Sequence, residues 1–374
     1  MLGYNKLKIE KCNHFEMIIF IFIVLERLNS IYCFKQWNKL SLLISMLELI
    51  LCTALLVRFF KLNKIPQKSL IILIFITGLL IICFFKNKTK MPLLALLIYL
   101  NGRTENFDNL SKVIRNAYGG LFMLSLFLYF LGISDSGISR GYDLSRSAVA
   151  LGFTHPNAAA ETIVFFVIAW SCSKIKSEKA FYIISIWGFL IVLFILKSRT
   201  ASILLAIVII FCNLKKRKKK WVSVPIIASF SPFILAFFSY KMQFIAKMPI
   251  FQTLNVLFAK RLYLLELQLS TYKLSLFGQQ HLIFDLGLDN SYVSYGLQYG
   301  LILMLIYIFA NCATVFKAWK NRKIEICIFS IIMSLYAFME NGFFNVFVNF
   351  ILLYLLVENK KMVAMKMKNN EVVK

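Results

Sequence analysis

Residues 152–172 read GFTHPNAAAETIVFFVIAWSC, a short polar patch that leads into an apolar segment long enough to form a membrane helix. Pro156 suits the first turn of an α-helix, because the amide hydrogen that proline lacks would have no partner inside the helix there. His155 and Asn157 lie at the boundary between the patch and the apolar segment. The stretch therefore predicts a helix over 156–173 that begins at one surface of a membrane with polar side chains at its entrance.

Composition supports the same class of protein. Hydrophobic residues make up 60% of the 374 residues and only 16% are charged, which is unlike a soluble domain. The first apolar segment, residues 17–34, is too long for a cleavable signal peptide and contains Glu26 and Arg27. The sequence thus predicts an all-α, polytopic integral membrane protein that keeps its first helix.

Apolar stretches near 20 residues can cross the hydrocarbon as helices, and the chain contains about twelve of them. The expected spans are residues 17–34, 40–60, 69–85, 91–102, 117–133, 156–173, 180–196, 200–213, 221–239, 291–310, 324–340 and 343–357. Basic residues cluster in short loops between spans, at 58–68, 103–115, 174–179, 215–220 and 317–323. Cytoplasmic loops of membrane proteins are rich in lysine and arginine. About twelve crossings place all these loops and both termini in the cytoplasm, and only the basic loop at 86–90 falls outside.

The net charge of +26 follows from these loops, so nucleic acid is not an expected partner. The outer face then has two sizeable segments, residues 134–155 and 240–290. Residues 254–277 are mostly apolar with interspersed charges, which predicts one or two amphipathic helices on the membrane surface. The expected architecture is one membrane domain over residues 1–374 with an external helical cap at 240–290.

Charged residues inside a membrane are costly and usually have a role. Arg27 and Glu48 lie at similar depths, roughly 10–12 Å from the outer ends of the first two expected helices, so we expect them to form an ion pair. Glu161 lies one turn beyond Asn157 on the same helix face and is a candidate for a polar site.

Several polar residues are expected together at the outer boundary. They are Arg140, Arg146, His155, Asn157, Arg199, Arg261, His281, Asp285, Asp289, Asn290 and Glu340. Guanidinium groups bind phosphate oxygens through paired hydrogen bonds, so the four arginines can hold a lipid-linked pyrophosphate; the alternative is contact with ordinary lipid head groups or loop ends. Glycosyl transfer from such a donor also needs a base, for which Asp289, His281, His155 and Glu340 are the candidates. No D-x-D pair occurs in an outer loop, and the eight cysteines form no C-x-x-C motif, so we expect neither a metal nor another cofactor.

The order of several short stretches carries a family resemblance. These are residues 152–157 after Arg146, Ser198-Arg199-Thr200, residues 261–278, Leu288-Asp289-Asn290-Ser291-Tyr292 followed by Gly300, and Glu340-Asn341. Over residues 140–357 the chain resembles the bacterial O-antigen and capsular repeat-unit polymerases, whose superfamily also contains the O-antigen ligases. The ligases place a histidine where this chain has Asp289, so the capsule-type polymerases are more similar.

The resemblance implies a glycosyltransferase of the bacterial cytoplasmic membrane that extends polysaccharide from undecaprenyl-pyrophosphate-linked oligosaccharides. Its partners would be this substrate, membrane lipid and other polysaccharide-assembly proteins. In the family, arginines of the outer loops bind pyrophosphate, which carries over to Arg146, Arg199 and Arg261. We expect Asp289 or His281 to act as the base, and His155 to shape the start of its helix or to orient substrate. The other site-shaping residues are Asn157, Glu161, Asn290, Tyr292 and Glu340. The alternatives are a flippase or transporter of lipid-linked oligosaccharide, and a ligase.

Overall fold

The computed structural model describes residues 14–62, 67–87, 91–102, 106–135, 139–140, 147–173, 177–215, 223–257, 261–279, 289–342 and 345–356. The first part contains α1 (His14–Leu28), α2 (Tyr32–Lys35), α3 (Asn38–Leu62), α4 (Gln67–Asn87), α5 (Met91–Asn101), α6 (Phe107–Phe130), β1 (Ser139–Arg140), β2 (Ser147–Ala148) and α7 (Pro156–Cys172). The second part contains α8 (Glu178–Leu190), the π-helical turn η2 (Ile191–Ile195), α9 (Arg199–Lys215), α10 (Ser223–Tyr240), α11 (Met242–Ile245), α12 (Ile250–Leu257), α13 (Arg261–Thr271), α14 (Ser291–Gln298), α15 (Leu301–Lys320), α16 (Ile324–Met339), the 3-10 turn η3 (Phe350–Leu352) and α17 (Leu353–Leu356). The fold is therefore almost entirely helical, and β1 and β2 form one short antiparallel pair.

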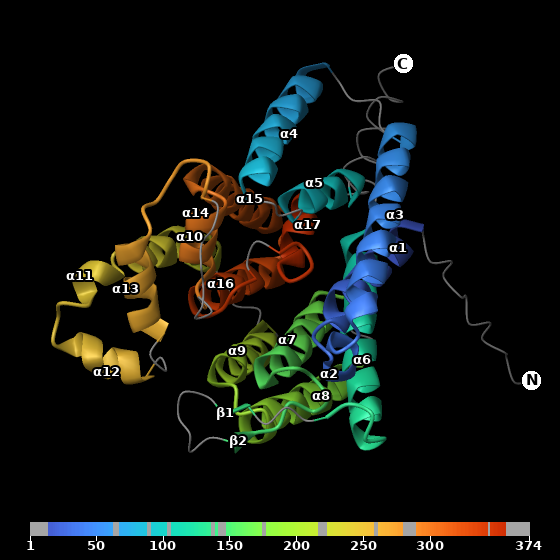
Figure 1. Cartoon of the computed structure of the whole chain (residues 1–374), viewed down its shortest axis with the longest axis vertical. Helices are drawn as coiled ribbons and strands as arrows, with labels where there is room; N and C mark the ends of the chain where they lie inside the picture. The colour runs from blue at the N-terminus through green and yellow to red at the C-terminus, as the bar shows by residue number, and fades with distance from the viewer. Residues whose placement is uncertain are drawn as a thin grey trace, which may run out of the picture.

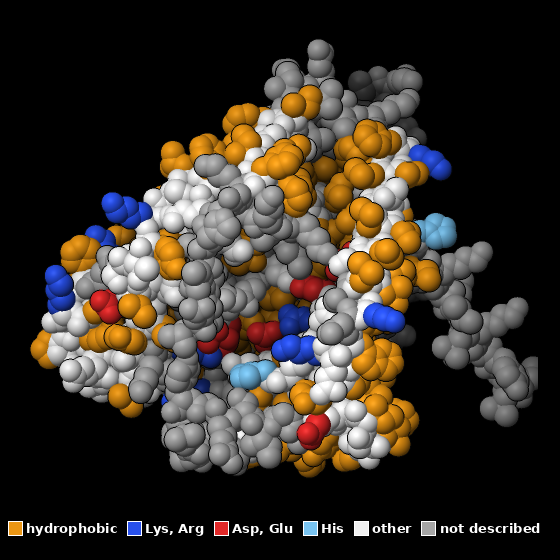
Figure 2. All heavy atoms as spheres, in the orientation of Figure 1, with side chains coloured by type: hydrophobic (Ala, Val, Ile, Leu, Met, Phe, Trp, Pro, Cys, Tyr) orange, Lys and Arg blue, Asp and Glu red, His pale blue; other side chains and the backbone are white. Residues whose placement is uncertain are grey.

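Five of the described helices are long and apolar enough to cross a membrane: α3, α6, α8 with η2, α10 and α15. Shorter apolar helices lie within α5, α7, α9 and α16. Large apolar side chains cover much of the outside, among them Phe60, Phe130 and Trp187, which are 77%, 78% and 63% exposed (Figure 2). Soluble monomers rarely expose so much apolar surface, so these helices have the character of a membrane protein.

The helices form a layered bundle around α7 and α16. Helix α7 packs against α6, α8 and α9, while α16 packs against α10, α15 and α9 and also contacts α7. Helices α11, α12 and α13 form a separate group beside α10 and the end of α16 (Figure 1). This arrangement brings the start of α7, the end of α16 and the start of α13 toward one region.

Several predicted helices have close counterparts. Helix α7 begins at Pro156 and α16 covers Ile324–Met339, as expected for residues 156–173 and 324–340. The spans predicted at 40–60, 69–85, 91–102 and 221–239 correspond to α3, α4, α5 and α10. The one or two helices expected over 254–277 correspond to the end of α12 and to α13, and α11 precedes them within the segment 240–290.

The helix predicted over 17–34 is interrupted, because α1 ends at Leu28 and the chain turns before α2. The hydroxyl of Ser30 donates to the carbonyl of Arg27 at 2.6 Å in this turn. The amide of Tyr32 donates to the carbonyl of Gly152 at 2.9 Å, and the amide of Thr154 donates to Ser30 at 2.7 Å. The turn is therefore tied to the polar patch that precedes α7.

Two other predicted spans are wrong as continuous helices. Residues 291–310 divide into α14 and α15 at Gly300, whose φ of +93° is a conformation that helices do not use. Residues 345–356 of the last expected span contain a turn, η3 and the short α17. The basic loop expected at 103–115 is also corrected, because α6 already begins at Phe107, capped by Asn106.

Candidate functional site

The polar patch before α7 caps that helix and packs against α6. Nδ1 of His155 accepts a hydrogen bond from the amide of Asn157 at 3.1 Å, and Pro156 occupies the first turn. Gly152 has φ of +86°, and a Cβ there would lie 2.6 Å from the carbonyl oxygen of Ser125. Partial burial lowers the pKa of His155 below its usual value. The structure thus agrees with His155 shaping the helix start.

Arg261 is the first residue of α13 and the centre of an ionic cluster. Its Nε lies 3.3 Å from Oδ2 of Asp289, and its Nη1 lies 2.8 Å from Oε1 of Glu340. Nη1 also donates to the carbonyl of Met339, and lies 3.4 Å from Oγ1 of Thr200. One guanidinium therefore joins the start of α13 to the start of α9, to the end of α16 and to Asp289, two residues before α14. Figure 2 shows acidic and basic side chains and a histidine gathered in a recess near the middle of this face.

The two carboxylates of the cluster differ in access to solvent. The side chain of Asp289 is 38% exposed, whereas that of Glu340 is 8% exposed. Burial raises the pKa of Asp289, and Arg261 acts in the opposite direction. Asp289 is thus the carboxylate that a substrate can reach, while Glu340 mainly holds Arg261.

Asn290, Ser291 and Tyr292 fasten the segment that carries Asp289. Asn290 is buried, and its amide nitrogen donates to Oγ of Ser239 and to the carbonyl of Phe338, each at 3.0 Å. The hydroxyl of Ser291 donates to the carbonyl of Glu340 at 2.7 Å. Tyr292 is fully buried, and its hydroxyl lies 3.3 Å from the carbonyl of Ser334. These bonds hold Asp289 beside the end of α16.

A second ionic group lies between α1, α7 and α16. Nη1 of Arg27 lies 2.9 Å from Oε2 of Glu161, and the hydroxyl of Tyr336 donates to Oε1 of the same carboxylate. The Arg27 guanidinium also lies 5.8 Å from the centre of the Tyr118 ring. The expected Arg27–Glu48 pair is therefore wrong, because Arg27 pairs with Glu161. The charge of Glu161 raises the pKa of both Asp289 and His155. The Arg27–Glu161 group therefore lies near the ionic cluster around Arg261.

The other predicted site residues are distributed as follows. Arg199 is the first residue of α9 and is exposed, and Asn157 is half-buried in the first turn of α7. Arg140 lies in β1. Arg146, His281 and Asp285 lie outside the described residues. The structure joins Arg261, Asp289 and Glu340 in one cluster and fastens Asn290 and Tyr292 beside α16, while His155, Asn157 and Glu161 lie at the start of α7.

Sequence reasoning did not assign Arg27, Tyr336 or Asn345 to the site. Asn345 donates a hydrogen bond to the carboxylate of Glu26, which is next to Arg27. Arg27 and Glu161 are 134 positions apart, so no local spacing indicates their contact. The sequence feature that could have indicated a role for Arg27 is its position beside Glu26 inside an apolar segment, where charged residues are costly.

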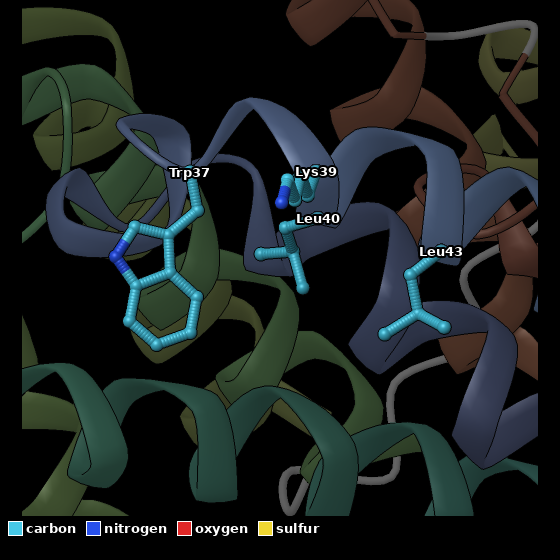
Figure 3. Close-up of a pocket in the computed structure, with 4 residues that line it drawn as sticks. All are labelled: Trp37, Lys39, Leu40 and Leu43. Carbon is cyan, nitrogen blue, oxygen red and sulfur yellow. The ribbon is translucent and has the colours of Figure 1, made fainter.

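Two further features bear on ligands. The described residues contain no group of three or more His, Cys, Asp or Glu side chains that could hold a metal ion. The pocket in Figure 3 is lined by Trp37, Lys39, Leu40 and Leu43, at the start of α3. It carries neither a carboxylate nor a histidine, so it does not share the chemistry of the ionic cluster.

Comparison with protein-family models, with curated proteins and with solved structures finds no match for this chain.

Proposed function

We propose that this protein is a membrane glycosyltransferase that polymerises undecaprenyl-pyrophosphate-linked oligosaccharide repeat units on the outer face of the bacterial cytoplasmic membrane, without a metal ion. In this proposal the chain crosses the membrane about twelve times, counting discontinuous helices, with both termini in the cytoplasm. The segment 240–290 then forms the external cap.

The observation that carries the proposal is the pairing of Arg261 with Asp289 and Glu340 where α9, α13 and α16 meet. An ionic cluster is costly in an apolar helical protein unless it has a role. Asp289 is fixed in position and partly open to substrate, as a general base must be. The motif order over 140–357 supports the same assignment.

In the proposed reaction, Asp289 accepts the proton of an acceptor hydroxyl on the incoming repeat unit. The hydroxyl oxygen forms a bond to the anomeric carbon of the growing chain, and the bond from that carbon to the pyrophosphate oxygen breaks. The lipid pyrophosphate leaves as an anion, and guanidinium groups near the site stabilise its charge. Nη2 of Arg261 makes no hydrogen bond with the described residues, so it offers a donor to an anion, and Arg199 is exposed at the first position of α9.

The test uses purified protein and purified lipid-linked repeat unit, with product length measured by gel electrophoresis and mass spectrometry. We expect polymer from the wild type and from Asp135→Asn, an exposed carboxylate on the 134–155 segment. We expect single repeat units with Asp289→Asn, because an amide does not accept the proton. Polymer of normal length from Asp289→Asn would contradict the role of Asp289.

A flippase is the second candidate, favoured by the Arg27–Glu161 pair in the interior of the bundle. In cells, loss of a polymerase leaves one repeat unit on the surface glycan, whereas loss of a flippase leaves none exported. Reconstituted vesicles give the matching biochemical test. Translocation of lipid-linked oligosaccharide without polymer formation would establish the flippase.

A further inference from the structure

The carboxylate of Glu161 is held by groups from two other helices. Arg27 from α1 forms the 2.9 Å ion pair with one oxygen, and Tyr336 from α16 donates to the other. The side chains of Arg27 and Glu161 are 12% and 18% exposed, so solvent screens their charges little. Both oxygens of Glu161 are therefore fixed, and the position of its charge is set by α1, α7 and α16 together.

This group is connected to the ionic cluster through the same two helices. Glu161 lies in α7, at whose start His155 forms the cap. Tyr336 lies in the last turn of α16, where its carbonyl accepts a hydrogen bond from the amide of Glu340 at 2.8 Å. A shift of Arg27 would therefore reach Asp289 through the charge of Glu161 and reach Glu340 through Tyr336.

We propose that Arg27 is a positioning residue for the transfer reaction, which acts through Glu161 and Tyr336 on the electrostatic environment of Asp289. The inference rests on the proposed function, because it assigns Arg27 to the reaction for which Asp289 is the base. Arg27 does not touch substrate in this role. It keeps a neighbouring negative charge paired, so that Asp289 can remain ionised.

The charges around Asp289 predict that variants of Glu161 and Arg27 shift the pKa of Asp289 in opposite directions. Arg261 faces Asp289 from α13, Glu161 and His155 act from α7, and Glu340 follows α16. The negative charge of Glu161 raises the pKa of Asp289. Neutralising Glu161 should therefore lower that pKa, whereas leaving Glu161 ionised without its cation should raise it. A role limited to packing would not produce shifts in opposite directions.

The experiment is the pH dependence of kcat/KM for polymerisation by purified full-length protein. With Glu161→Gln we expect the acid limb of the profile to move to lower pH by at least about 0.5 unit. With Arg27→Met we expect it to move to higher pH by a similar amount, and Arg27→Lys should retain the wild-type limb. Tyr336→Phe keeps the ring and the Arg27–Glu161 ion pair but removes one neutral donor to Glu161, so its limb should lie close to that of the wild type.

A matched control comes from a buried polar pair in another part of the bundle. Asn311 of α15 and Ser330 of α16 exchange hydrogen bonds of 2.8 and 3.0 Å. Asn311→Ala should lower thermal stability without moving the acid limb. If the Arg27→Met protein does not fold, the downward shift of Glu161→Gln against the unchanged limbs of Arg27→Lys and Asn311→Ala provides the test.

Unchanged limbs in the Glu161 and Arg27 variants, or shifts in the same direction, would overturn the inference while leaving the polymerase assignment intact. Absence of polymerisation by the wild type under all conditions would instead overturn the proposed function. The two failures are thus distinguished within one experiment.

Discussion

Replacing Asn290 by alanine tests whether one buried side chain fixes the segment that carries Asp289. Asn290 is 3% exposed. Its Oδ1 accepts from the amide of Val293 at 3.0 Å, which caps α14. Its Nδ2 donates to Ser239 and to the carbonyl of Phe338, each at 3.0 Å. The substitution therefore removes one helix cap and two buried hydrogen bonds at once.

The expected loss of stability is the sum of these contributions. A lost N-cap costs about 1 kcal/mol. Leaving the Phe338 carbonyl without its donor, and weakening the Ser239 contact, adds about 2 kcal/mol together. Asn106→Ala is a matched control, because Asn106 caps α6 by accepting from the amide of Asp108 at 3.0 Å but is exposed. It should cost only about 1 kcal/mol.

Both variants can be compared by unfolding the detergent-solubilised protein with increasing SDS, and by the polymerisation assay. We expect Asn290→Ala to lose about 2 kcal/mol more than Asn106→Ala, since only Asn290 makes the two buried donor bonds. We also expect kcat to fall in Asn290→Ala, because Asp289 is no longer held beside Arg261. Equal losses of stability in the two variants would refute this account of the Asn290 side chain.

Four further outcomes are expected. Gly300→Ala should lower the free energy of thermal unfolding by at least about 2 kcal/mol, because its φ is +93° and a Cβ would lie 2.3 Å from the Leu276 carbonyl oxygen. Gly120 of α6 is the control, because a Cβ there would have no neighbour within 4 Å. Gly120→Ala should raise the free energy of unfolding by up to about 1 kcal/mol. Arg261→Lys should lower kcat/KM at least about ten-fold, because an ammonium group cannot reproduce contacts made from Nε and Nη1, and wild-type rates would contradict this. Since burial raises the pKa of Asp289, activity should be lost on acidification at a higher pH than an exposed aspartate would give, as a pH–rate profile can show. Polymerisation should persist in EDTA, and a loss that magnesium restores would contradict the metal-free reaction.

The helices that the sequence predicted well are those whose boundaries are set locally. Pro156 begins α7 because its ring suits the first turn of a helix. Helix α16 coincides with an apolar run that is bounded by polar residues. The start of α6 was also marked locally, by Asn106 before Phe107-Asp108, but the nearby basic residues favoured a loop there. Charge pattern and capping pattern gave different answers in that segment, and the cap agrees with the structure.

The contacts that the sequence could not indicate join distant parts of the chain. The turn after α1 is held by Gly152 and Thr154, so hydropathy alone extended the first helix across it. Arg27 likewise lay at a depth that matched Glu48, but helix packing places it against Glu161. Membership of the site was predictable for Asp289, Arg261 and other residues next to recognisable motifs. Their pairing depends on how α9, α13 and α16 meet, which a one-dimensional pattern does not contain.

The ion pair between Arg27 and Glu161 also sets an order of events during synthesis. Its two residues are 134 positions apart, so at typical rates of translation Arg27 emerges roughly 7 to 27 seconds before its partner. Until α7 has been made, this guanidinium lacks the carboxylate with which it pairs in the folded chain. The partners of Arg27 and of the turn after α1, which are Glu161 and residues 152–154, are available only when α7 has been made. Helix α1 can therefore pack against α3 and α6 before its arginine meets Glu161.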